Sequence, residues 1–139
     1  MSRLLICLLC VVASGCSLFS EDDTDLGTFS DYEAYLEERE DLLAELDREI
    51  GEARASDIVA CAVVAIGEKA CGGPTGYRVY STEASDVSEI NRLAEAIAAM
   101  DRQANRQFEL ASTCDVPVEP TVALVGGQCR VGDGVPSAD

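Results

Sequence analysis

Four cysteines, Cys61, Cys71, Cys114 and Cys129, constrain the fold of this chain more than any other feature. An even number of cysteines in an exported domain is typical of disulfides. Three pairings are open, and we predict Cys61–Cys71 and Cys114–Cys129 because near neighbours close small loops. In the chain-entropy estimate, a loop of 10–15 residues contributes roughly 3 kcal/mol. A four-cysteine zinc site is the alternative, but it needs a close pair such as C-x₂-C, which these spacings lack. We therefore expect two disulfides, with no metal and no cofactor.

The N-terminus indicates export. A single cationic residue, Arg3, precedes an apolar run of ten residues, Leu4 to Ala13. A helix of that length is about 15 Å long, half of a hydrocarbon core of roughly 30 Å, so the run cannot span a membrane. It has the pattern of a secretory signal peptide. The run ends in "ASGC", which resembles a bacterial lipobox with Cys16 as the lipidated first residue of the mature chain, although Ala13 stands where Leu is usual.

The lipobox pattern implies a location. Two other interpretations of the N-terminus are an ordinary secreted protein with a chance cysteine near the cleavage site and a buried N-terminal strand. Bacterial lipoproteins carry two or three acyl chains, a diacylglycerol and often a palmitate, on this cysteine, whereas one chain anchors only marginally. Ser17 follows Cys16, where an Asp would favour inner-membrane retention. We expect anchoring in the outer membrane, on its periplasmic or its cell-surface face.

Composition divides the chain. We expect a signal peptide over residues 1–15, an acidic flexible tether over 16–28, one domain over 29–132 and a frayed tail over 133–139. The whole chain has 26 Asp and Glu against 10 Lys and Arg, a formal net charge of −16. Binding to nucleic acid is disfavoured, because phosphate contacts need a basic face. The acidity is typical of a solvated surface, and it also suits a basic protein partner in the envelope.

Two helices and four strands predict an α+β fold. The first helix is expected to begin at Ser30, with Glu33 completing a capping box. Its apolar face is interrupted by Arg39. The second amphipathic helix is expected from Asp86 to Phe108. Both are predicted to pack on one small antiparallel sheet, whose strands are residues 58–66, 77–82, 121–125 and 128–131, with the last two joined by a Gly126-Gly127 turn.

The segment "CGGPTGYRVYS", residues 71–81, is the candidate interaction loop. Its candidate residues are Gly72, Gly73, Pro74, Tyr77, Arg78 and Tyr80. Neither G-x-G-x-x-G nor the P-loop pattern is present, so phosphate binding is not indicated. The competing interpretation is a disulfide-stapled turn, in which Tyr77 packs inward and Arg78 points to water.

The layout from Cys61 to Val131, with "CGGPTGYRVYS" as its most specific part, resembles a group of small exported bacterial lipoproteins that share a CGGPxxYxxYS motif. The resemblance implies a location and a related fold. It implies no activity.

Residue types favour a protein without enzymatic activity. The chain has no histidine, the commonest general base and metal ligand, and no G-x-S-x-G motif. Its carboxylates gather on the outer face of the first predicted helix rather than in a cleft. We expect an envelope protein-interaction or structural module, and the alternative is an inhibitor of a basic hydrolase such as lysozyme.

Overall fold

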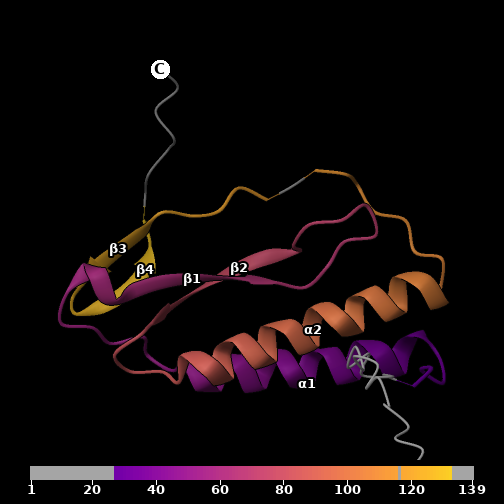
Figure 1. Cartoon of the computed structure of the whole chain (residues 1–139), viewed down its shortest axis with the longest axis horizontal. Coiled ribbons are helices and arrows are strands. Elements are labelled where there is room, and N and C mark those ends of the chain that lie inside the picture. Colours follow the sequence, from indigo (N-terminus) through magenta and orange to yellow (C-terminus); the bar gives the residue numbers. More distant parts are fainter. Residues whose placement is uncertain (1–26, 116, 133–139) are drawn as a thin grey trace, which may run out of the picture.

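The computed structural model describes residues 27–115 and 117–132. The predicted signal peptide, the lipidation site Cys16, most of the tether and the predicted tail lie outside these residues. The described chain has two α-helices and two small antiparallel sheets (Figure 1), so the predicted α+β class is confirmed. No helix within the described ranges has the length and apolarity needed to cross a membrane.

Helix α1 spans Tyr32–Ile50. Its N-cap is Asp31 rather than the predicted Ser30, because the Asp31 carboxylate accepts a 2.9 Å hydrogen bond from the Ala34 N–H. A carboxylate also complements the positive end of the helix dipole. Gly51 is the C-cap that follows the helix, and its φ of 55° lies in the left-handed region that glycine adopts without strain.

Helix α2 spans Val87–Gln107, and Asp86 is its N-cap as predicted. The Asp86 carboxylate accepts hydrogen bonds from the N–H groups of Ser88 and Glu89. The predicted apolar stripe is buried; its fully or nearly fully buried members are Ile90, Leu93, Ile97, Met100 and Ala104. Because α1 and α2 lie side by side beneath the strands (Figure 1), this stripe faces both α1 and the β1–β2 sheet.

The first sheet pairs β1, Cys61–Ile66, with β2, Gly76–Ser81. Its antiparallel register runs from Cys61↔Ser81 to Ile66↔Gly76 without a bulge. The first three residues of the predicted 58–66 strand instead form a short 3₁₀ helix, η1, Ile58–Ala60. The Asp57 side chain causes this difference, because it caps the turn by accepting a 3.0 Å hydrogen bond from the Val59 N–H.

The second sheet is a hairpin of β3, Val122–Val125, and β4, Gln128–Val131, joined by the predicted Gly126-Gly127 turn. The prediction of a single sheet was wrong. The Cys129 N–H donates to the Ala53 carbonyl at 2.9 Å, and the Gly127 carbonyl accepts from the Ala55 N–H at 3.1 Å. The segment after α1 therefore occupies the outer edge of β4, and this edge does not pair with the β1–β2 sheet.

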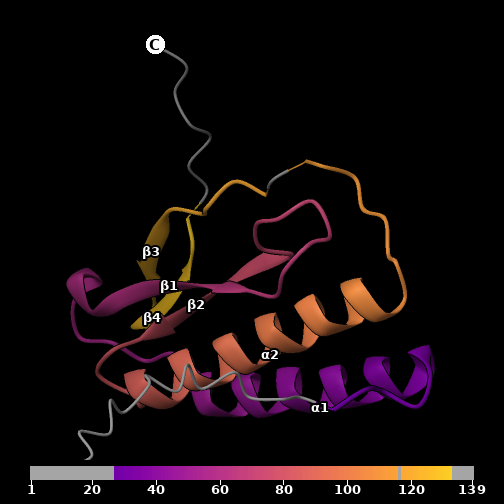
Figure 2. The ribbon, with the colours of Figure 1, turned by 45° about the vertical axis from the view of Figure 1, so that its right-hand side comes forward.

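The disulfides join Cys61 to Cys129 and Cys71 to Cys114, so the predicted connectivity was wrong. Cys61 is the first residue of β1, and Cys71 lies in the loop beyond its other end. A strand rises about 3.3 Å per residue, so β1 itself keeps the two cysteines apart. The chain after α2 passes over the strands on the side away from the helices (Figure 2), where Cys114 meets the 67–75 loop.

Candidate functional site

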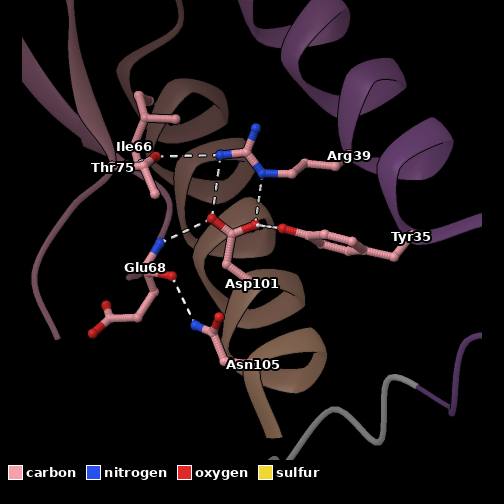
Figure 3. Close-up of polar contacts among 7 residues, drawn as sticks. All are labelled: Tyr35, Arg39, Ile66, Glu68, Thr75, Asp101 and Asn105. Carbon is pink, nitrogen blue, oxygen red and sulfur yellow. Dashed lines mark hydrogen bonds and ion pairs between the residues drawn. The ribbon is translucent and has the colours of Figure 1, made fainter. Parts of the chain in front are cut away.

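The polar centre of the domain is Asp101, a residue of α2 that is only 2% exposed. Its Oδ1 accepts hydrogen bonds from the Tyr35 hydroxyl at 2.9 Å and from Arg39 Nε at 2.7 Å. Its Oδ2 accepts from Arg39 Nη2 at 3.2 Å and from the Glu68 N–H at 3.0 Å. Four donors from two segments, α1 and the loop after β1, therefore converge on one buried carboxylate of α2 (Figure 3).

Tyr35 and Arg39 reach Asp101 from the same face of α1, because residues four apart are neighbours on a helix. Arg39 Nη2 also donates to Thr75 Oγ1 at 3.2 Å, and the Thr75 hydroxyl donates to the Ile66 carbonyl at 2.8 Å. The guanidinium thus links both helices to the chain that joins β1 and β2 (Figure 3).

Gly67 lets the backbone approach this cluster. Its φ is +71°, and a Cβ placed there would collide with Asp101 Oδ2 and Thr75 Oγ1. One residue later, the Glu68 carbonyl accepts a 2.9 Å hydrogen bond from Asn105 Nδ2. Glu68, the second residue after β1, is therefore held on α2 at both its N–H, which is bonded to Asp101, and its carbonyl, which is bonded to Asn105.

The surroundings shift two ionisation equilibria. Burial raises the pKa of Tyr35 well above its usual range, and the hydrogen bond to the Asp101 carboxylate raises it further. Burial is the largest single effect on Arg39 and opposes its charge, but the hydrogen bonds and charge of Asp101, with smaller contributions from Tyr35, together outweigh it, so the pKa of the guanidinium is raised. The stable form of the cluster is a neutral phenol beside an ion pair.

A cavity of about 340 Å³ opens beside the cluster, between α1, α2 and the two segments joined by the Cys71–Cys114 disulfide. Two cations border it, Arg39 and Lys69. Lys69 Nζ donates to the Asp115 carbonyl at 2.6 Å and lies 3.4 Å from the Asp115 carboxylate. Each cation therefore already has an anionic partner. In the described part of the chain, no group of three or more His, Cys, Asp or Glu is placed to hold a metal ion.

The residues of the predicted interaction loop do not form one site. Gly72 and Gly73 have φ of 88° and 80°, and Pro74 is half-buried. Tyr80 is 6% exposed and belongs to the main core, so it is not available to a partner.

The two remaining candidate residues, Tyr77 and Arg78, belong to β2 and lie on opposite faces of the β1–β2 sheet. Arg78 does not simply point to water, because its Nε donates to the Asp47 carboxylate of α1 at 2.9 Å. Tyr77 is half-buried and pairs with Ala65, on the face turned away from Val64 and the helices. The loop therefore presents no common surface of Tyr77, Arg78 and Tyr80.

The Asp101 cluster was not predicted as a site. Arg39 was recognised only as an interruption of an apolar stripe. Asp101 lies four residues after Ile97 and three before Ala104, so it interrupts the apolar face of α2 in the same way. Two opposite charges, each on the buried face of a helix, are the signal that predicts such a pair, because a buried charge needs a partner.

Comparison with known proteins finds no matching family model, no matching curated protein and no matching solved structure.

Proposed function

We propose that this chain is a non-enzymatic lipoprotein, anchored in the outer membrane through lipid on Cys16, that acts as an interaction or structural module for a protein of the cell envelope. The observation that best supports a non-enzymatic role is the hydrogen bonding of Asp101, the most buried carboxylate among the described residues. Both of its oxygens accept two hydrogen bonds, and its side chain is buried. A carboxylate used in this way stabilises a scaffold and has no free position for a substrate or a proton in transfer.

The scaffold supports presentation of surfaces rather than chemistry. The two disulfides fasten the β3–β4 hairpin to β1 and the 67–75 loop to the chain after α2. The Asp101 cluster fastens that same loop to both helices. A domain held at these points keeps its exposed faces in a fixed arrangement, which lowers the entropic cost of binding a partner. The anchor rests on the "ASGC" pattern alone.

Two measurements test this proposal. Fatty-acid labelling and membrane fractionation should show lipid on the wild-type chain and none on Cys16→Ala. Capture from envelope extracts by the soluble domain, residues 17–139, should then retain one envelope protein in stoichiometric amount. Labelling that persists in Cys16→Ala would contradict the anchor, and the absence of a stoichiometric partner would contradict the interaction role.

The second candidate function is inhibition of a basic hydrolase such as lysozyme. It is favoured by the exposed acidic side chains of α1, which are Glu33, Glu37, Glu38, Glu40, Asp41 and Asp47. Lysozyme turnover should be measured with the soluble domain at low and at moderate salt, with Glu37→Gln/Glu38→Gln/Asp41→Asn as the matched variant. Inhibition that disappears with salt reflects charge attraction alone, whereas inhibition that survives supports this candidate.

A further inference from the structure

One edge of β1 has no partner strand. The Thr82 N–H donates to the Ala60 carbonyl, and the register pairs Ala62 with Tyr80 and Val64 with Arg78. In an antiparallel pair, alternate residues direct their backbone groups to the neighbouring strand. The N–H and C=O groups of Val63 and Ala65 therefore point away from β2, and none of them has a hydrogen-bond partner among the described residues.

The edge lacks the features that usually prevent strand addition. Natural proteins protect edges with charges, prolines, bulges or a covering segment. β1 reads CAVVAI, without a charge or a proline, and pairs with β2 without a bulge. Ala65 is exposed. The outer edge of β2 differs, because Arg78 of that strand binds Asp47 and its Nη1 donates to the Tyr77 carbonyl.

A groove runs beside this edge. Its volume is about 490 Å³, and it lies between β1, α2 and the loop after β1. The side chains that line it on α2 include Ala94 and Ala98, which are small enough for another backbone to approach. Its charged side chains are Glu68, Glu95 and Arg102, and Arg102 is bound to Glu95. The groove thus has a net negative charge within a chain of net charge −16.

We propose that the free edge of β1 binds an extended, basic segment of a protein partner as an added β-strand, with the groove along α2 receiving its side chains. This inference rests on the proposed interaction role and specifies the site and the chemistry of the partner. Main-chain hydrogen bonds to Val63 and Ala65 supply affinity, and the Glu68 carboxylate, together with the net negative charge of the chain, selects lysine or arginine. Pairing with a second copy is disfavoured, because each chain carries the same large negative charge.

The probe is a short blocked peptide of alternating lysine and valine, titrated into the isotopically labelled soluble domain. Amide resonances of Val63 and Ala65 should shift, and their hydrogen exchange should slow at least about tenfold, since each gains a hydrogen bond. A peptide of alternating glutamate and valine should not bind. A peptide of alternating lysine and proline, with the same charge but little capacity to pair as a strand, should bind much more weakly.

Ala65→Pro removes the outward N–H without removing a bond to β2, and Ala65→Thr is its matched control. Affinity should fall at least about tenfold in Ala65→Pro and stay close to wild type in Ala65→Thr. If Ala65→Pro does not fold, the amide hydrogen-exchange rates of Val63 and Ala65 in the wild-type chain still show whether the peptide binds at the edge of β1. The inference is overturned if the lysine–valine peptide does not bind, or if it binds Ala65→Pro as well as wild type. It is also overturned if the resonance shifts are confined to α1 or if the domain self-associates through β1. An envelope partner captured equally by wild type and Ala65→Pro overturns this site and leaves the proposed function standing.

Discussion

Asp101 is the residue on which the contact between α1, α2 and the 67–75 loop depends. We predict that Asp101→Asn lowers the free energy of unfolding by about 3 kcal/mol, because removing one partner leaves a partly buried Arg39 uncompensated. This lies at the low end of the range for buried pairs, since the Arg39 side chain keeps 22% exposure. Urea denaturation measures the change.

The control is Arg39→Met/Asp101→Leu, which replaces the pair with apolar side chains of similar volume. It should recover most of the lost stability, because the pair itself contributes little beyond compensating its own desolvation. A double variant no more stable than Asp101→Asn would show that the hydrogen bonds to Tyr35 and Glu68, rather than charge compensation, dominate.

Tyr35 gives a pH dependence at the same site. Its pKa is raised in the folded state, so above about pH 10 the unfolded chain loses this proton while the folded chain retains it. Ionisation of the unfolded state is favourable, and stability therefore falls as the pH rises above about 10. Chemical denaturation at a series of pH values should show this loss, and Tyr35→Phe should reduce its slope. An unchanged slope in Tyr35→Phe would exclude Tyr35 as its source.

Gly67 and Gly72 form a matched pair. Both have positive φ, +71° and +88°, so alanine is strained at either position. A Cβ at Gly67 collides with Asp101 Oδ2 and Thr75 Oγ1, whereas one at Gly72 meets nothing within 4 Å. We predict that both variants lower the melting temperature and that Gly67→Ala lowers it clearly more. Equal losses would show that backbone strain alone accounts for the requirement for glycine.

Individual caps and turns were largely predictable from sequence. Asp86 and Gly126-Gly127 act where local chemistry indicated, because their interactions are made within a few residues. Asp31 was missed by one position, since Ser30 and Asp31 both suit a cap and only the backbone path selects between them. The Arg39–Asp101 pair joins residues 62 apart in the sequence, and local pattern carries no information about which two helix faces meet.

At the scale of elements, the strand assignment already contradicted the predicted disulfides. A strand that begins near Cys61 and ends before Cys71 places these cysteines at opposite ends of an extended segment. Loop-closure entropy favours short loops only when the intervening chain is free to bend. The two observed disulfides have sequence separations of 68 and 43, so each closes a loop worth about 4 kcal/mol in the chain-entropy estimate.

Peptide mapping under non-reducing conditions tests this connectivity. Trypsin leaves Cys114 and Cys129 in one peptide, because no Lys or Arg lies between them. Combined digestion with trypsin and an endoprotease that cleaves before Asp115 separates them. We expect the Cys61 peptide linked to the Cys129 peptide and the Cys71 peptide linked to the Cys114 peptide. A Cys114–Cys129 link, or free thiols, would contradict the structure.

At the scale of the whole molecule, the fold class was predictable and the assembly was not. Apolar stripes indicated two helices, and alternation indicated strands, because both patterns record burial on one face. The Ala53–Ala55 segment occupies the edge of β4 and has no strand pattern of its own, so local pattern did not predict that this edge is covered.

The net charge of −16 gives a prediction for the whole molecule. Self-repulsion destabilises a compact acidic chain, and salt screens exposed charges over about 10 Å at 0.1 M. The melting temperature should therefore rise when sodium chloride is added to a low-salt buffer. A melting temperature that stays flat or falls would show that surface repulsion does not limit stability.

Two variants of α1 separate the net charge from local charge pairs. Glu37 lies four residues from both Glu33 and Asp41, so Glu37→Lys converts two like-charge pairs into two opposite-charge pairs. Glu40→Lys changes the net charge equally, but Leu36 and Ala44 occupy its positions four residues away. Pairs at this spacing contribute about 0.2–0.5 kcal/mol each. At low salt, both variants should melt above wild type, with Glu37→Lys higher than Glu40→Lys. The difference between them should close as salt screens the local pairs, and a difference that persists at high salt would point to packing rather than charge.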